Sequence, residues 1–255
     1  MPNVLNASEL LYLSLLFGAE EVFGLPDVFT GKTDDEIKKM IDETAVSCTE
    51  KELISVDFDG KMKLDESIDK AIGMIATADK VTELIYRNTD ERQKRYLIYY
   101  KKEERVILYE SGGEYFITGE SGFEKVYNGI KVLFADGHLM NSGLSGFKIT
   151  ADEVAEARAG AKPKSSIMRA LMYDKGVDET TSTLVTNALA GRAGYFSAVT
   201  VDRLNNDIAT AMFIVDYGLV CQVSSDRKSN NHYAAIDNET ARQIALSFAG
   251  GNTNV

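Results

Sequence analysis

Histidine and cysteine are scarce in this chain, with two of each among 255 residues. Neither His138 nor His232 has a cysteine or carboxylate at the spacing of metal ligands, so we expect surface histidines in loops and no metal site. Cys48 lies near a helix end and Cys221 lies in an apolar strand, far away in the sequence. This pattern predicts two buried free thiols and a reducing, intracellular environment.

Positive charge is also in short supply, because the formal net charge is −11. Binding to nucleic acid or to anionic lipid requires lysine and arginine concentrated on one face. The densest basic stretch, 92–105, is interrupted by Glu103 and Glu104, and it spans two predicted strands. It is typical of a solvated surface, so we expect no nucleic-acid partner.

Long hydrophobic runs are missing as well. The opening segment, MPNVLNASELLYLSLLFGAEEVFG, has no basic leader, and Glu9, Glu20 and Glu21 interrupt its apolar residues. A membrane-spanning helix needs about 20 consecutive apolar residues. We therefore expect no membrane insertion and a cytoplasmic location.

What the chain does contain is an internal duplication. Both 64–134 and 177–248 read as a helix, four short strands and a closing helix, at an offset of about 113 positions. LDESIDKAIGMIATADKVTELIY aligns with VDETTSTLVTNALAGRAGYFSAV without a gap. A unit repeated only twice predicts two related subdomains and not an open solenoid. We expect an N-terminal subdomain at 1–136, a glycine- and serine-rich connector at 137–149, and a C-terminal subdomain at 150–255.

A leucine-rich helix is predicted near the start of the chain. Asn6 or Ser8 can cap it, and it runs to about Phe23, where Gly24 and Pro26 end it. Four residues form its expected buried side: Leu10, Leu13, Leu16 and Phe17.

Two more helices and a hairpin precede the first repeat. One helix starts near Asp34, and a short one follows Thr49. The segment ISVDFDGKMKL alternates apolar residues around Asp59 and Gly60, which predicts a β-hairpin. The apolar stripe of the helix near Asp34 consists of Ile37, Met40 and Ile41.

Within the repeats, the periodicity predicts helices and strands of similar length. In YLIYY and VILY both alternate faces are apolar, so these strands should be covered on both sides. The first repeat has a helix at 65–78, strands at 81–87, 94–101, 105–110 and 114–118, and a helix at 122–134. The second part has short helices beginning near 150 and 163, a helix from 178, strands at 196–201, 208–215, 219–224 and 233–236, and a helix at 239–248.

Three motifs resemble functional sites and fail on inspection. An EF-hand loop starting at Ser55 would place Asp57, Asp59 and Glu66 suitably, but its first position should be aspartate. TGKT lacks the leading glycine and the preceding strand of a nucleotide-binding loop. GLSGF and GESGF lack the last glycine of a nucleophile elbow.

Two acidic pairs recur in the duplicated halves, Asp65-Glu66 and Asp178-Glu179. Both lie in the first turn of a predicted helix, where carboxylates accept from free N–H groups and interact favourably with the helix dipole. Helix capping explains both pairs. The residues therefore support no catalytic centre, and we expect neither an enzyme nor a cofactor.

The arrangement of these segments resembles the EspG family of type VII secretion chaperones. The resemblance rests on the leucine-rich first helix, the segment ELISVDFDGKMKLDESIDKAIGMIATADK with its glycine turn and small apolar residues, and the strand entry VTELIYR. It covers nearly the whole chain and rests on pattern and duplication. It implies an α+β fold of two pseudo-twofold-related α/β repeats, with a central antiparallel sheet flanked by two helical bundles.

The resemblance also implies a function. A cytosolic specificity chaperone or adaptor would bind the helical hairpin of an export substrate of the WXG100, LXG or PE/PPE-like type. Binding a helical tip requires aromatic, methionine or arginine anchors within a wide surface and no converging titratable groups.

The turn between the first two repeat strands differs from its counterpart DRLNND at 202–207, and we expect it to bind the client. The expected partner-binding residues are Arg87, Asp90, Arg92, Gln93, Met168 and Met172.

Two alternatives belong to other classes. One is a small-molecule-binding or enzymatic domain with a site in the cleft between the two repeats, which requires a deep polar pocket with perturbed pKa values. The other is a calcium-modulated structural protein, which calcium would stabilise against heat.

Overall fold

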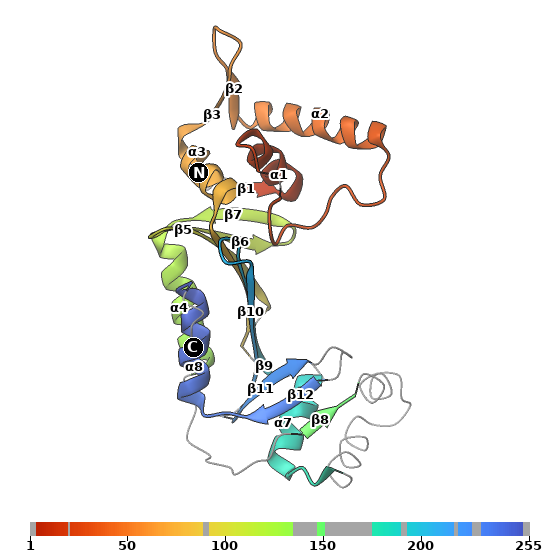
Figure 1. The fold of residues 1–255 in the computed structure, drawn as a ribbon, viewed down its shortest axis with the longest axis vertical. Helices are drawn as coiled ribbons and strands as arrows, with labels where there is room; N and C mark the ends of the chain where they lie inside the picture. Colours follow the sequence, from red (N-terminus) through yellow and green to blue (C-terminus); the bar gives the residue numbers. More distant parts are fainter. Residues whose placement is uncertain are drawn as a thin grey trace. The chain divides into compact units, whose positions relative to one another are not determined.

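The computed structural model describes residues 4–19, 21–88, 92–134, 147–150, 175–189, 193–216, 219–225 and 231–251 (Figure 1). This part of the chain contains six helices and twelve strands. The helices are α1 (Ala7–Leu16), α2 (Asp34–Glu50), α3 (Glu66–Thr77), α4 (Glu120–Leu133), α7 (Glu179–Leu189) and α8 (Asn238–Ala249).

Ten of the strands form one sheet in the order β1-β7-β6-β5-β4-β9-β10-β11-β12-β8, and β2 pairs with β3 in a separate hairpin. The prediction of an α+β protein with a large antiparallel sheet is confirmed. The strands are β1 (Val4–Asn6), β2 (Ile54–Val56), β3 (Met62–Leu64), β4 (Lys80–Arg87), β5 (Lys94–Lys101), β6 (Glu104–Ser111), β7 (Glu114–Thr118), β8 (Phe147–Ile149), β9 (Gly194–Asp202), β10 (Asp207–Asp216), β11 (Leu219–Ser225) and β12 (Asn231–Ala235).

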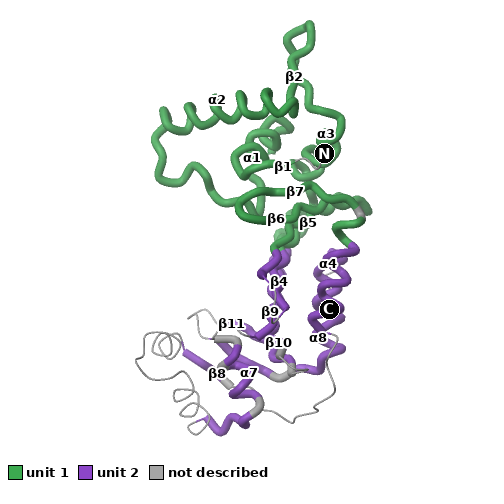
Figure 2. Tube along the Cα trace, turned by 180° about the vertical axis from the view of Figure 1, so that it is seen from behind, with its two compact units in different colours: residues 1–83, 95–123, 201–207 green, residues 84–94, 124–200, 208–255 purple. Residues whose placement is uncertain are grey.

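The chain divides into two compact units (Figure 2). Unit 1 comprises residues 1–83, 95–123 and 201–207, and unit 2 comprises residues 84–94, 124–200 and 208–255. The predicted subdomain boundaries, which follow the sequence in a simple order, stay a prediction. Of the predicted connector at 137–149, the structure describes Phe147–Ile149, which form β8.

The core of unit 1 is formed by α1, α3 and the strands that they cover. Ile68, Ile72 and Ile75 of α3 are spaced for one helical face and are fully buried in this core. In β5 and β6 the consecutive residues Leu97–Ile98 and Ile107–Leu108 are at most 1% exposed, which confirms that these strands are covered on both faces.

The core of unit 2 contains a cluster of three phenylalanines. Phe134, Phe196 and Phe213 contact one another with ring centroids 5.8 to 6.2 Å apart, a spacing typical of aromatic packing. A second group of buried residues, which includes Val185, Cys221 and Tyr233, lies on α7, β11 and β12.

Local hydrogen bonds explain where several elements begin. The hairpin has the predicted centre, with Ile54 opposite Leu64 and Gly60 at φ +75° in its turn. Asp65 caps α3 by accepting from the Ser67 N–H, and Asp178 accepts from the Thr181 N–H at the start of α7. These contacts confirm the capping role of Asp65 and Asp178, and Glu66 and Glu179 lie in the first turn of the two helices as expected.

Three predictions about secondary structure are wrong. The first helix ends at Leu16 and not near Phe23, because Gly18 adopts φ +79° and its N–H donates to the Leu15 carbonyl. No separate helix follows Thr49, since its hydroxyl donates to the Ala45 carbonyl within α2 and does not cap a new helix.

The third wrong prediction is the placement of His232 in a loop. It lies in β12 opposite Lys148 of β8 and not in a loop, although it is exposed as expected. His138 and the helices predicted near 150 and 163 lie outside the described residues.

Candidate functional site

The first helix, α1, has apolar residues on two sides. Leu10 and Leu13 are fully buried in the core of unit 1. Leu16 and Phe17 were expected beside them but are 43% and 40% exposed. A different set, Ser8, Tyr12, Leu15 and Leu16, follows the i, i+4, i+7, i+8 spacing of one helical face and lines a groove.

The second helix supplies the opposite wall of this groove. Met40, Ile41 and Thr44 of α2 face it, and Val28 and Phe29 of the loop before α2 complete its lining. We call this cavity of about 200 Å³ the α1–α2 groove. Cys48 is the only residue of α2 that is buried, so Met40 and Ile41 of its apolar stripe line the groove and are not part of the core.

The loop between the two helices is attached to β5. The Tyr99 hydroxyl donates to the Phe23 carbonyl at 2.9 Å, and the Arg95 guanidinium donates to the Gly24 carbonyl. Gly24 has φ +82°, and a Cβ atom there would come within 2.4 Å of Leu97 Cδ2. Only glycine fits this position, which fixes the path of the chain toward the groove.

Beyond Gly24, Asp27 orders the segment that carries Val28 and Phe29. Its carboxylate accepts from the N–H groups of Phe29 and Thr30 at 2.9 and 3.0 Å. Hydrogen bonds from Thr30 and Phe29 lower the pKa of Asp27, which therefore keeps its negative charge.

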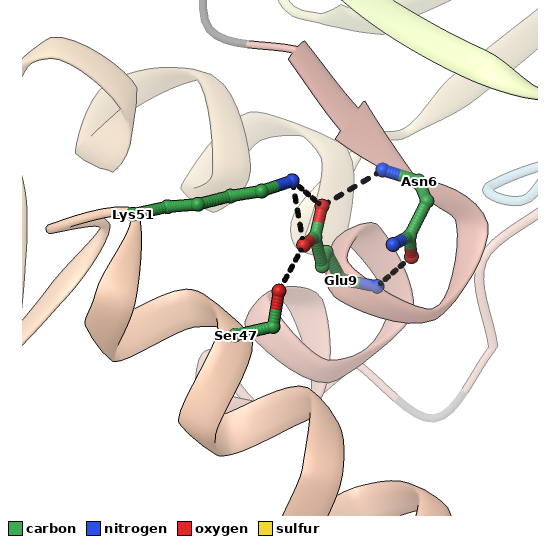
Figure 3. Close-up of polar contacts among 4 residues, drawn as sticks. All are labelled: Asn6, Glu9, Ser47 and Lys51. Atoms are coloured by element: carbon green, nitrogen blue, oxygen red, sulfur yellow. Dashed lines mark hydrogen bonds and ion pairs between the residues drawn. The ribbon is translucent and has the colours of Figure 1, made fainter.

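A buried carboxylate holds the two walls of the groove together (Figure 3). Glu9 is 1% exposed and accepts from the Asn6 N–H at 2.9 Å, which forms the capping box at the start of α1. It also accepts from the Ser47 hydroxyl at 2.7 Å and from Lys51 Nζ at 2.7 and 2.9 Å. We call Asn6, Glu9, Ser47 and Lys51 the Glu9 cluster.

The charge of Glu9 is stabilised in the folded protein. Burial acts to raise its pKa, but the hydrogen bonds from Lys51, Asn6 and Ser47 outweigh burial, so the pKa lies below its usual 4.5. The Glu9 cluster therefore attaches the C-terminal end of α2 to α1 at neutral pH.

The structure describes three of the six residues predicted to bind a partner. Arg87 ends β4, is partly buried, and donates from Nη2 to the Ala193 carbonyl at 2.9 Å. Arg92 and Gln93 are exposed just before β5. The other three, Asp90, Met168 and Met172, lie outside the described residues, so the contact set as a whole stays a prediction.

The titratable groups with clear pKa shifts have structural explanations. Burial raises the pKa of the Cys48 and Cys221 thiols to about 11, and both are free and buried, as predicted. Within the described ranges, no three histidine, cysteine, aspartate or glutamate residues could hold a metal ion. None of the helices described above combines the length and hydrophobicity that crossing a membrane requires.

Sequence reasoning missed the α1–α2 groove. The signal was present in two capping boxes, at Asn6 with Glu9 and at Thr33 with Glu36. Together they fix the starts of two helices that carry more apolar residues than the core covers. The side-chain spacing does not say that Glu9 would face Ser47 and Lys51, because that contact joins segments about 40 residues apart.

Comparison with known proteins identifies the fold. No family model matches the chain, and no curated protein matches its sequence. Among the matching solved structures is that of the Mycobacterium tuberculosis type VII secretion system chaperone EspG5 in complex with the PE25–PPE41 dimer. The TM-score is 0.51 at 11% sequence identity, and the match covers 97% of this chain and 95% of that chain. The chain therefore has an EspG-like fold.

Proposed function

We propose that this chain is a cytosolic, non-enzymatic chaperone or adaptor of a type VII-like secretion system that binds helical secreted proteins. The observation that carries the proposal is the likeness to EspG5 over nearly the full length of both chains. EspG5 was solved in complex with the PE25–PPE41 dimer, so the partner proposed for this chain is a helical export substrate of the PE/PPE, WXG100 or LXG type.

We further propose that 64–134 and 177–248 are copies related by a pseudo-twofold axis. Two observations support this relation. The order of a helix, four strands and a helix occurs in both segments. The strand order also reverses about its centre, because β7-β6-β5-β4 is followed by β9-β10-β11-β12, with the short β1 and β8 at the ends.

The turn that joins β4 to β5 is the proposed client contact. Its counterpart between β9 and β10 is engaged within unit 1, since the Arg203 N–H donates to the Asp79 carbonyl and Lys80 pairs with Asp202 at 3.5 Å. Arg92 and Gln93 of the first turn are exposed and available to a partner. Asp90, Arg87, Met168 and Met172 complete the proposed contact set.

The test is co-expression with the small helical proteins encoded near the gene for this chain, followed by purification and native mass spectrometry. We expect a stoichiometric complex with at least one of them. The absence of binding to every such protein at micromolar concentration would contradict the proposed function.

Two variants locate the contact once a complex is found. Arg92→Glu combined with Gln93→Glu should weaken the complex, because it replaces a cation and a neutral amide by two carboxylates. Leu204→Glu is the matched control, since Leu204 lies in the counterpart turn and is 75% exposed. A complex that survives the double variant unchanged would refute the site while leaving the function intact.

A further inference from the structure

A continuous segment of unit 1, residues 26–46, contributes no side chain to the core. None of its residues is buried, and none is among the apolar residues that form the core of unit 1 or pack against it. The residues on either side differ, because Val22 is only 7% exposed and Cys48 is fully buried. We call residues 26–46 the strap. It comprises the loop after Leu25 and the first part of α2, up to Val46.

The polar contacts of the strap are internal. Asp27 accepts hydrogen bonds from N–H groups of its own loop, and the Thr33 N–H donates to the Glu36 carboxylate at 2.8 Å to begin α2. In the described part of the chain, the hydrogen bonds and ion pairs of the strap have both partners within 26–50. Polar contacts therefore do not attach the strap to α1 or to the sheet.

The strap contacts α1 through apolar side chains that stay partly exposed. Val28, Phe29, Met40 and Ile41 line the α1–α2 groove, and Ile41 is 37% exposed. The free energy gained by such a contact is proportional to the apolar area that it removes from water. Separation of the strap from α1 should therefore cost much less free energy than disruption of the core.

Both ends of the strap are attached more firmly than its middle. Before it, the Tyr99 hydroxyl donates to the Phe23 carbonyl, and Leu25 packs against the core. After it, Glu9 accepts from Ser47 and Lys51 (Figure 3). A segment with few buried contacts between two fixed ends is typical of the regions that open locally while a protein stays folded.

We propose that the strap opens from α1 as one cooperative unit while the core of unit 1 stays folded, so that it is a reversible cover over the outer apolar side of α1. Opening and unfolding of the strap are coupled, because isolated helices shorter than about 12–15 residues are marginal in water and only 34–46 of the strap is helical. Opening uncovers Tyr12, Leu15 and Leu16, which line the groove from α1. The cover is separate from the proposed client contact, since Arg87, Arg92 and Gln93 belong to unit 2.

Native-state hydrogen exchange of the full chain, followed by NMR, tests the proposal. We expect the amides of 38–46 to exchange at least about a hundredfold faster than the central amides of α3, with similar protection factors throughout 38–46. Low concentrations of urea should change the exchange of the strap less than that of α3, because local opening exposes less surface than global unfolding does.

Two matched substitutions on α2 show whether the groove contact closes the strap. Ile41→Ala removes part of that contact, whereas Val46→Ala does not, since Val46 is 57% exposed and does not line the groove. Both replace a β-branched residue by alanine and so gain similar helix propensity. The strap should exchange about threefold faster in Ile41→Ala than in Val46→Ala, with the exchange of α3 equal in the two variants.

The anchor after the strap can be tested in the same way. Glu9→Gln weakens the attachment of Ser47 and Lys51, so the rapidly exchanging region should extend from 46 to the end of α2 at Glu50. The exposed control Glu43→Ala should leave the boundary at 46.

Three results would overturn the proposal. One is protection of 38–46 equal to that of α3, which would make the strap part of the core. Another is a steady gradient of protection along α2, which would indicate fraying from an exposed helix end and not cooperative opening. The third is equal exchange of the strap in Ile41→Ala and Val46→Ala, which would show that the groove contact does not hold it closed.

Discussion

Helices α2 and α3 lie in the same unit and are both amphipathic, but only one of them belongs to the core. Of the 12 residues of α3, six are buried, whereas the 17 residues of α2 include one, Cys48. The apolar stripe of α3 packs on the sheet, while Met40 and Ile41 of α2 line the groove. Amphipathicity therefore indicates that a helix has an apolar face, and it does not say whether that face is covered by the same chain.

The two helices are also held in place by different forces. Helix α3 is fixed by apolar burial, which is not directional. The described contacts of α2 with α1 include the polar Glu9 cluster, in which one carboxylate accepts from three residues. If this contrast is correct, substitutions in the two helices should differ in size and in pH dependence.

The largest difference is expected for matched isoleucine substitutions. Ile72→Ala in α3 removes a fully buried side chain and should lower the free energy of unfolding by about 2–5 kcal/mol. Ile41→Ala in α2 should lower it by less than about 1 kcal/mol, because Ile41 is 37% exposed. Urea denaturation of both variants measures these values, and similar losses would show that α2 is part of the core.

The next effect comes from the Glu9 cluster. Glu9→Ala leaves the Asn6 N–H and the Ser47 hydroxyl without their acceptor, and should lower the free energy of unfolding by about 2–3 kcal/mol. Glu43→Ala is the control, since Glu43 is 66% exposed and pairs with Lys39 only on the surface. Its effect should stay below about 0.5 kcal/mol. If Glu9→Ala lowers the free energy of unfolding by no more than Glu43→Ala does, the Glu9 cluster does not hold α2 against α1.

The pH dependence of this effect has a definite sign. The folded-state pKa of Glu9 lies below the usual 4.5, so its charge stabilises the folded protein fully above that value and less as the pH falls through the folded-state pKa. The gap in melting temperature between the wild type and Glu9→Gln should therefore be constant at neutral pH and narrow in acid. A gap that widens below pH 4.5 would contradict the predicted direction.

The smallest expected effect is a local opening at the end of α2, which the reactivity of the Cys48 and Cys221 thiols can measure. Because burial raises the pKa of Cys48 and Cys221 to about 11, both should react slowly with iodoacetamide at pH 8 in the wild type. In Glu9→Ala the end of α2 should open more often, so that Cys48 reacts roughly several-fold faster while Cys221 is unaffected. Equal acceleration at both cysteines, measured by mass spectrometry, would indicate global unfolding instead.

Much of this fold could be predicted from the sequence because local patterns determine it. The eight long strands, α3 and the hairpin follow from alternation, helical periodicity and the turn at Asp59 and Gly60. The end of α1 could not be placed, since Gly18, Gly24 and Pro26 are all suitable stops. Only the structure shows that the helix ends at Leu16, where the Gly18 N–H donates to the Leu15 carbonyl.

The candidate site was less predictable for a physical reason. The pattern identified Met40 and Ile41 as apolar but assigned no surface for them to cover. The groove exists because Glu9 contacts Ser47 and Lys51, and because Arg95 and Tyr99 hold the Phe23–Gly24 segment on β5. These contacts join distant segments through single side chains, so they cannot be predicted from the periodicity of apolar residues in the sequence.

The central claim is that this chain is a scaffold that binds helical secreted proteins. Isothermal titration calorimetry of the purified chain with its co-encoded helical partner tests that claim most directly. We expect saturable binding at a fixed stoichiometry, with a dissociation constant of about 1 μM or lower and a negative heat-capacity change from apolar burial. The absence of saturable binding to every helical secreted protein of the source organism would contradict it.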